Sequence, residues 1–312
     1  MRVVFMGTPA FAAPTLSALH EAGYEVVSVV TQPDRPVGRG QRLTPPPVKA
    51  RALELALPVY QPGRIKSPEA LEHLQQAAAE AIVVVGYGQL IPRAILDLPR
   101  LGCLNVHASL LPKYRGAAPM QWAIANGETL TGVTTMRIEE RLDAGDMLLR
   151  QEVRIGPQET TPELAGRLAP VGAALLIETL RQLAANQIVP VKQKEEEATY
   201  APLLKREDGW IDWTRPATQI ANRIRGFEPW PGGYTSFRGK RLHLRKARAS
   251  DAAAPRPGQI SLADGHLHAG CGGGTSLLIE EVQLEGKNRV TVSDFVRGYQ
   301  PKEEETLGEI KL

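Results

Sequence analysis

The sequence has 312 residues, of which 43% are hydrophobic and 23% are charged, a composition that excludes disordered and fibrous chains. Cys103 and Cys271 are its only cysteines and lie far apart, which excludes a disulfide framework and is compatible with a reducing compartment. The net charge of +3 is too small to indicate a nucleic-acid partner by itself, so the distribution of charge along the chain matters more.

The chain is longer than the size at which a single hydrophobic core is usual, so we expect two domains. No stretch approaches the roughly 20 uninterrupted apolar residues that are needed to cross a bilayer. The apolar N-terminus divides into a strand, a turn and a helix instead of forming the continuous run of a signal peptide. These features predict a cytoplasmic protein without a membrane partner. A monomer is the expected state.

Strand-like and helix-like segments alternate through the first part of the chain. An apolar run at residues 2–6 ends at Gly7, and Pro9 marks the start of a helix that ends at Gly23. Further predicted strands span residues 26–30, 81–85, 103–107, 132–138 and 147–153, and predicted helices span 69–80 and 161–186, the latter interrupted at Pro170. This alternation predicts an α/β fold, with a Rossmann-like, mainly parallel sheet domain over residues 1–189.

The pattern of residues changes after position 189. Hydrophobic periodicity is lost at residues 190–208, where polar residues dominate, and we interpret this segment as a linker. Short alternating strands separated by Gly- and Pro-rich turns follow at residues 234–248 and 258–296. They predict a small, OB-like β-barrel as a C-terminal domain over residues 209–312.

Polar side chains occur where two of the predicted strands end. Asn105 and His107 are two residues apart, so they project from the same face of the strand at 103–107. Asp143 lies in a Gly-containing turn after the strand at 132–138. Because open parallel sheets bind ligands beyond the carboxyl ends of their strands, we expect these side chains to converge. An amide, an imidazole and a carboxylate could bind a carbonyl, stabilise the oxyanion formed when a nucleophile adds, and accept a proton. That set suits acyl or formyl transfer.

Other roles fit the same residues. An Asn-x-His pair more often serves capping and core hydrogen bonds than catalysis, and a lone Asp in a turn is more often a turn residue or a helix cap. Covalent catalysis fits less well, because the nearest hydroxyl, Ser109, lies in a turn without an obvious base in the sequence. Spacing alone therefore leaves the chemistry open.

Several segments resemble the methionyl-tRNA formyltransferase family. They read FMGTPAFA, TQPDRPVGRGQRLTPPPVK, NVHASLLPKYRGAAP, LDAGDM and FEPWPGGYT. The resemblance extends over nearly the whole chain and is weakest after about residue 250. NVHASLLP together with LDAGDM is typical of the wider group of formylfolate-using enzymes, whereas the arginine-rich segment and the second domain indicate the tRNA enzyme within it.

The resemblance implies a reaction and a role for each motif residue. The formyl group of 10-formyltetrahydrofolate would be transferred to the α-amino group of methionyl initiator tRNA, without a metal. Asn105 and His107 would donate hydrogen bonds to the formyl oxygen, and Asp143 would orient the imidazole and accept the amine proton. The folate-contacting stretches would be Gly86, Tyr87, Gly88, Gln89 and Leu90, and then Ser109, Leu110, Leu111 and Pro112.

Two basic segments contain the candidate tRNA-binding residues. Between 34 and 49 the only acid is Asp34, and glycines and prolines predict an exposed loop; between 223 and 248 eight basic residues oppose only Glu228. The resemblance implies that both segments contact tRNA, although a solvated surface explains the same charges without it. The residues concerned are Arg35, Arg39, Arg42, Lys49, Arg223, Arg225, Arg238, Lys240, Arg241, Arg245 and Lys246.

Some functions are disfavoured and others remain as alternatives. The first strand is followed by neither a G-x-G-x-x-G nor a Walker-type loop, which argues against NAD or ATP binding. His266, His268 and Cys271 lack a fourth ligand at metal-binding spacing. A formyltransferase acting on a nucleotide-sugar amine, or a formylfolate hydrolase, would use the same catalytic residues. A noncatalytic RNA-binding protein would need only the basic segments.

Overall fold

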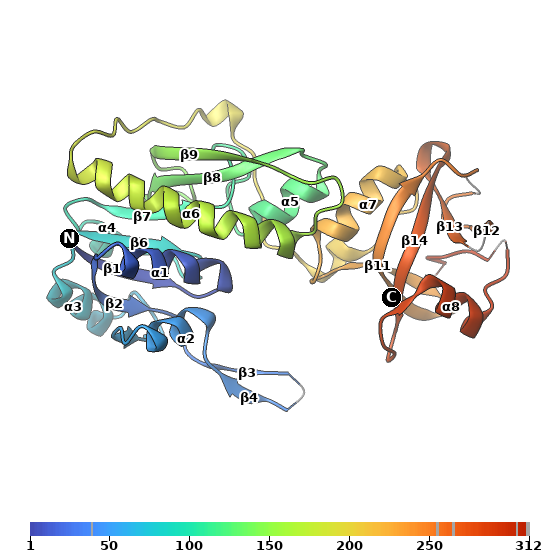
Figure 1. Cartoon of the computed structure of the whole chain (residues 1–312), viewed down its shortest axis with the longest axis horizontal. Helices are drawn as coiled ribbons and strands as arrows, with labels where there is room; N and C mark the ends of the chain where they lie inside the picture. The colour runs from blue at the N-terminus through green and yellow to red at the C-terminus, as the bar shows by residue number, and fades with distance from the viewer. Residues whose placement is uncertain (39, 254–255, 264–265, 304, 310–312) are drawn as a thin grey trace. The chain divides into compact units, whose positions relative to one another are not determined.

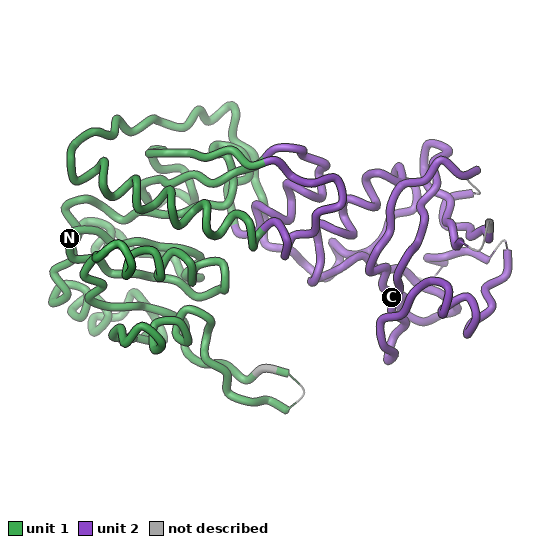
Figure 2. Tube along the Cα trace, in the orientation of Figure 1, with its two compact units in different colours: residues 1–116, 131–153, 165–201 green, residues 117–130, 154–164, 202–312 purple. Residues whose placement is uncertain are grey.

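The structure is a computed structural model and describes residues 1–38, 40–253, 256–263, 266–303 and 305–309. Its internal contacts divide the chain into two units (Figure 2). Unit 1 contains residues 1–116, 131–153 and 165–201, and unit 2 contains residues 117–130, 154–164 and 202–312. Each unit is therefore assembled from segments that are separated in the sequence.

Unit 1 is built on a seven-stranded sheet (Figure 1). In spatial order the strands are β5 (Val59–Tyr60), β2 (Glu25–Val30), β1 (Arg2–Gly7), β6 (Ala81–Val85), β7 (Cys103–His107), β8 (Leu130–Arg137) and β9 (Met147–Arg154). The first five pair in parallel, and β8 lies antiparallel to β7. The predicted Rossmann-like, mainly parallel sheet is confirmed.

Helices cover both faces of this sheet. They are α1 (Ala13–Glu21), α2 (Pro47–Glu54), α3 (Pro68–Ala77), α4 (Arg93–Leu96) and α6 (Thr161–Ala184). Side chains of α3 and α4 share one core cluster with apolar residues of β1 and β6, while α1 and α6 lie over the other face (Figure 1). α6 packs closely enough that a Cβ at Gly172 would lie 2.8 Å from a methyl carbon of Val106. Burial on both sides explains why β6 is apolar at every position.

The predicted interruption at Pro170 is wrong, because α6 is a single helix with this proline inside it. A proline in a helix interior costs about 3 kcal/mol through a lost hydrogen bond and a steric clash. Burial of a leucine stripe offsets that cost, since each fully buried leucine contributes roughly 2 kcal/mol. The stripe consists of Leu164, Leu168, Leu176 and Leu180. Neither α6 nor any other helix among the described residues combines the length and apolarity needed to span a membrane.

The basic segment at 34–49, predicted to be an exposed loop, contains a short hairpin and the first residues of α2. β3 (Arg35–Val37) and β4 (Arg42–Thr44) pair antiparallel. Gly38 and Gln41 have positive φ values of 74° and 46°, which turn the chain back between the strands. The predicted exposure is confirmed at both arginines that begin these strands.

Unit 2 contains a six-stranded antiparallel sheet. In spatial order the strands are β10 (Gly233–Phe237), β11 (Lys240–Ser250), β14 (Thr275–Leu284), β13 (His266–Cys271) and β12 (Ile260–Ala263), with β15 (Val290–Thr291) beside β14. Its helices are α5 (Pro119–Ala125), α7 (Ala217–Gly226) and α8 (Val292–Tyr299). Apolar residues of α7, α8 and the sheet share one core cluster. The predicted small, barrel-like β domain is confirmed.

The prediction of strand structure at residues 292–296 is wrong, because these residues begin α8. The Thr291 hydroxyl accepts a hydrogen bond from the Asp294 N–H at 3.3 Å and so caps the first turn. Phe295 is buried in the core, stacked against Tyr299 one turn later. A polar N-cap and an apolar pair at helical spacing thus override the strand pattern.

The polar segment after α6 is bound to unit 1 over much of its length. Val191 and Met147 exchange two backbone hydrogen bonds, at 2.8 and 2.9 Å. Glu195–Glu197 form one 3-10 turn, and the Ala201 N–H donates to the Arg115 carbonyl at 2.7 Å. Residues 165–201 accordingly belong to unit 1. The predicted boundaries at 189 and 209 remain predictions.

Candidate active site

The three side chains predicted to converge lie together in unit 1. Asn105 and His107 are on β7, and Asp143 is in the turn between β8 and β9. The Asn105 Nδ2 donates a long hydrogen bond, 3.5 Å, to Asp143 Oδ1. The His107 Nδ1 lies 3.7 Å from Asp143 Oδ2. Because β7 and β8 are neighbours in the sheet, residues 38 positions apart in the sequence share one site.

The second ring nitrogen of His107 is already in use. Its Nε2 lies 2.9 Å from the Tyr114 carbonyl oxygen, and a carbonyl can only accept, so Nε2 carries a proton. The neutral imidazole therefore presents an unprotonated Nδ1 toward Asp143. His107 can donate from Nδ1, to Asp143 or to a ligand, only with a second proton on the ring, because Nε2 keeps its own. Its side chain is only 6% exposed, so bulk water screens this interaction little.

Asp143 is held in an uncommon backbone conformation. Its φ is +48°, a left-handed value that costs a non-glycine residue about 1–2 kcal/mol. The Gly116 N–H donates to Asp143 Oδ2 at 2.7 Å, and the Asp143 carbonyl accepts a hydrogen bond from Gln193 Nε2 at 2.8 Å. Side chain and backbone are therefore both fixed by residues that lie outside the turn itself. A carboxylate fixed in this way is preorganised toward β7.

The segment that follows β7 is folded by its own polar groups. Thr134 of β8 donates from its hydroxyl to the Ser109 carbonyl at 2.7 Å and accepts from the Leu111 N–H at 3.2 Å. The Ser109 hydroxyl donates to the Lys113 carbonyl at 2.6 Å and is fully buried. Because the Ser109 hydroxyl is buried and bonded to the Lys113 carbonyl, it is poorly placed to act as a nucleophile. Of the predicted folate residues here, Leu110 is half-buried, and Ser109, Leu111 and Pro112 are buried.

The other predicted folate stretch, residues 86–90, follows β6, which pairs with β7 and places Val84 beside Asn105. Gly86 and Gly88 have φ values of 58° and 90°, and both are exposed together with Leu90. Tyr87 instead points into the core cluster of unit 1, and burial raises the pKa of its phenol to about 12. Gln89 accepts from the Ile65 N–H at 2.8 Å. Only the backbone and the exposed members of this stretch can meet a ligand.

The basic residues of the segment 34–49 differ in availability. Arg35 and Arg42 are exposed, and Arg39 lies outside the described residues. Lys49 is half-buried and donates to both oxygens of Asp34 at 2.8 Å. Hydrogen bonds from Gln61 and Lys49 lower the pKa of the Asp34 carboxyl. The Lys49 charge, in the first turn of α2, is thus paired with Asp34.

In unit 2 the tertiary structure supplies acids that the local sequence lacks. Arg238 pairs with Glu305, Arg245 with Glu228, and Lys246 with Glu280, at 2.9, 3.6 and 3.4 Å. Glu280 and Glu305 come from segments outside residues 223–248, so the local excess of positive charge is partly neutralised. Lys240 is exposed, and Arg241 is half-buried over the Tyr234 ring.

Arg223 and Arg225 have internal roles within unit 2. Arg223 donates to the Asp208 carbonyl at 2.9 Å and lies over the Phe227 ring at 4.8 Å. Arg225 donates to the Glu159 carbonyl at 2.8 Å and to Asn222. Burial lowers the pKa of both guanidinium groups. The N–H groups of both side chains therefore bind acceptors within unit 2.

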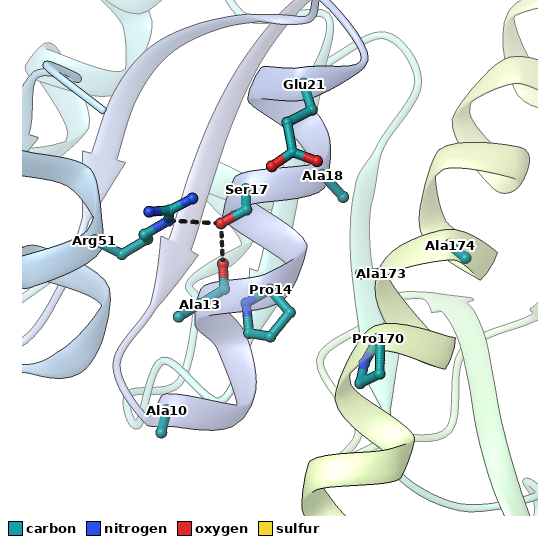
Figure 3. A pocket seen from close by; sticks show the side chains of 10 residues that line it. All are labelled: Ala10, Ala13, Pro14, Ser17, Ala18, Glu21, Arg51, Pro170, Ala173 and Ala174. Atoms are coloured by element: carbon teal, nitrogen blue, oxygen red, sulfur yellow. Dashed lines mark hydrogen bonds between the residues drawn. The ribbon is translucent and has the colours of Figure 1, made fainter. Parts of the chain in front are cut away.

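A shallow groove of about 680 Å³ occupies a different part of unit 1, between α1 and α6 (Figure 3). Its lining is mostly alanine and proline, and its main polar contact is the hydrogen bond from Arg51 Nε to Ser17 Oγ at 2.7 Å. None of the three convergent side chains lines it. Within the described ranges, no group of three or more His, Cys, Asp or Glu side chains is arranged to hold a metal.

Sequence reasoning missed several groups that shape the site. Tyr114 and Gly116 contribute backbone atoms, for which residue type carries little signal. Thr134 could have been found, because it faces His107 across the β7–β8 pair. Gln193 lies in a segment without periodicity, and nothing in the sequence indicates its role.

Comparison with known proteins identifies this chain as a group-transfer enzyme and shows its family. The formyl transferase family model matches residues 1–180, and the model of the formyl transferase C-terminal domain matches residues 203–300. The chain belongs to the formyl transferase family. Within it, this chain groups with the methionyl-tRNA formyltransferases.

That grouping rests on relatives of nearly equal length. The methionyl-tRNA formyltransferase of Solibacter usitatus is 56% identical over 99% of both chains, and that of Koribacter versatilis is 53% identical over 99% of both. Among solved structures, an N-formyltransferase from Helicobacter canadensis, in complex with folinic acid and dTDP-3-aminofucose, has a TM-score of 0.67 at 17% identity. It covers 89% of this chain and 98% of its own, and at this identity the likeness shows the fold alone.

Proposed function

We propose that this protein transfers the formyl group of 10-formyltetrahydrofolate to the free α-amino group of methionyl initiator tRNA, giving N-formylmethionyl-tRNA for translation initiation. The observation that carries the proposal is the meeting of Asn105, His107 and Asp143, at 3.5 and 3.7 Å, in a chain similar to methionyl-tRNA formyltransferases along its length. A cytoplasmic location and a monomeric state remain predictions.

The reaction joins the amine nitrogen to the formyl carbon and breaks the bond from that carbon to N10 of the folate. The amine loses a proton and N10 gains one, so the overall charge is unchanged. A free α-amine has a pKa near 7.7–8.0, so its deprotonation near neutral pH requires little help. The tetrahedral intermediate carries its negative charge on the former formyl oxygen. Donors placed around that oxygen are usually the largest single contribution to such a reaction.

Each of the three side chains has one group left for this chemistry. The Asn105 amide has two N–H groups, and only one of them faces Asp143. The second is available to the formyl oxygen. His107 would donate from Nδ1, because Nε2 is bound to the Tyr114 carbonyl. Asp143, whose Oδ2 lies 3.7 Å from the His107 Nδ1, would orient the imidazole and accept the amine proton.

We infer that the folate donor binds beside β7, between residues 86–90 and residues 109–112. The first stretch offers exposed backbone at Gly86 and Gly88 and the exposed side chain of Leu90. Tyr87 contributes through its backbone, because its ring lies in the core. The second stretch begins two residues after His107, which would bring the formyl group next to the imidazole.

The tRNA surface is proposed to include both basic segments. Arg35 and Arg42 on the hairpin, and Lys240 in unit 2, are exposed and suited to phosphate contacts. The remaining described candidates have internal partners and would contribute charge more than direct contacts. They are Lys49, Arg223, Arg225, Arg238, Arg241, Arg245 and Lys246. Arg39 remains a prediction from sequence.

The decisive test supplies 10-formyltetrahydrofolate with charged initiator tRNA, with uncharged initiator tRNA, or with a dTDP-linked amino sugar. The proposal predicts a formylated product only with the charged tRNA. Formylation of the sugar would support the nucleotide-sugar alternative. Release of formate at the same rate without any amine would support a hydrolase. Binding of tRNA without turnover would support a noncatalytic RNA-binding protein.

A further inference from the structure

Residues 191–201, which we call the strap, contact both segments that position the candidate catalytic groups. At one end, the backbone of Val191 pairs with Met147, directly after the Asp143 turn. At the other end, the Arg115 N–H donates to the Thr199 carbonyl at 2.8 Å, and the Tyr114 N–H donates to the Thr199 hydroxyl at 2.9 Å. The same stretch of chain that supplies Tyr114 and Gly116 to the site is thus fixed by the strap.

Gln193 is the third residue of the strap, and both the nitrogen and the oxygen of its amide are hydrogen-bonded. Its Nε2 donates to the carbonyls of Asp143 and Gly145, both at 2.8 Å. Its Oε1 accepts from Arg115 Nε at 2.9 Å. The orientation of the amide follows from its partners, because a guanidinium only donates and a carbonyl only accepts. One side chain therefore connects the turn that carries the carboxylate to a buried arginine.

Arg115 anchors this connection. It is 1% exposed, and its other two nitrogens donate to the Glu195 carboxylate at 3.2 and 3.0 Å. Glu195 also accepts from Arg141, which belongs to the Asp143 turn, at 2.8 Å. A bidentate guanidinium–carboxylate pair restricts orientation as well as distance. The turn is therefore bound from the strap through its backbone at Asp143 and Gly145 and through its side chain at Arg141.

We propose that Gln193 is a positioning residue for formyl transfer and that Arg115 holds it in place, a role that rests on the function proposed above. Asp143 keeps its left-handed φ of +48° with its carbonyl bonded to Gln193 and its carboxylate bonded to the Gly116 N–H. Without Gln193, the Asp143 and Gly145 carbonyls form hydrogen bonds with water instead, and the backbone of the Asp143 turn relaxes. The carboxylate then moves away from Asn105 and His107. A misplacement of about 1 Å costs on the order of 100-fold in rate.

The test uses the full chain with Gln193→Ala and Gln193→Met. The matched control is Gln76→Ala, which removes an exposed glutamine bonded to Glu72 on α3. Two quantities are measured: formyl-transfer kinetics with methionyl initiator tRNA, and hydrogen exchange of the Gly116 amide, which reports directly on its bond to Asp143. We expect both Gln193 variants to lower kcat by about 10- to 100-fold and to change either KM by less than about threefold. The Gly116 amide should exchange about tenfold faster, while the control should change neither quantity.

The outcomes separate the role of Gln193 from the proposed function. A kcat within about threefold of the parent, or an unchanged Gly116 exchange rate, overturns the positioning role. If Gln193→Ala melts near the assay temperature, Gln193→Met, which keeps most of the side-chain volume, is judged by the same criteria. If the parent protein forms no formylated tRNA, the proposed function fails, and the Gly116 exchange rate still decides whether Gln193 holds Asp143.

Discussion

Gly145 is a position where the addition of a single methyl group should disturb the site. A Cβ there would lie 2.0 Å from the Arg137 carbonyl oxygen and 2.9 Å from the Arg137 carbonyl carbon, whereas real Cβ atoms essentially never approach within 3.0 Å. The atoms must therefore separate by about 1 Å. Arg137 is fixed in β8 by its pairing with Leu104 of β7, so the turn is the part that moves. The turn carries Asp143.

Gly145→Ala should therefore lower the turnover of formyl transfer by about 100-fold, the usual effect of a 1 Å misplacement of a catalytic group. A stability loss of about 1–3 kcal/mol from overpacking should accompany it. The assay follows N-formylmethionyl-tRNA formation at saturating folate donor and tRNA, with the melting temperature measured on the same preparation. Gly166→Ala is the control, because a Cβ there meets nothing within 4 Å, and in a helix it should stabilise by up to about 1 kcal/mol. A folded Gly145→Ala protein with turnover within about threefold of the parent would refute the assigned role of the Asp143 turn.

Asn105→Ala and His107→Ala should each lower turnover by about 100-fold or more, the usual loss of an oxyanion donor, and turnover within threefold of the parent would remove both residues from the mechanism. Arg35→Ala combined with Arg42→Ala should raise the KM for methionyl-tRNA but not for the folate donor and should weaken the salt dependence of that KM; an unchanged tRNA KM would exclude the hairpin from the RNA surface. Burial lowers the pKa of His243 from 6.5 to about 4, with smaller contributions in the same direction from Arg245, Arg241 and Arg206 and an opposing one from Glu285. Between these two pH values, His243 binds a proton in the unfolded chain but not in the native state. The melting temperature should fall as the pH is lowered from 6.5 to about 4, and equal falls in the parent and His243→Phe would contradict this assignment.

Those features that local patterns control could be predicted from the sequence. The buried strands β1 and β6 are short apolar runs, and such runs arise because both faces of the sheet are covered by helices. The spacing of Asn105 and His107 puts them on one face of β7 because side chains alternate along a strand. Errors of local prediction arose at Pro170 and at residues 292–296. In the first, burial of an apolar stripe outweighed a proline, and in the second, a threonine cap outweighed strand-like alternation.

Tertiary structure decided which polar groups meet. Gln193 and Asp143 are 50 residues apart, and the strap has no hydrophobic periodicity from which their contact could be predicted. The positive charges of β11 are partly neutralised by Glu280 on β14, which only the pairing of the two strands brings beside them. Apolar periodicity is a local property of the sequence. One face of a strand consists of every second residue, and one face of a helix consists of residues three or four positions apart. A hydrogen bond depends on where the partner is, and that position exists only once the chain has folded.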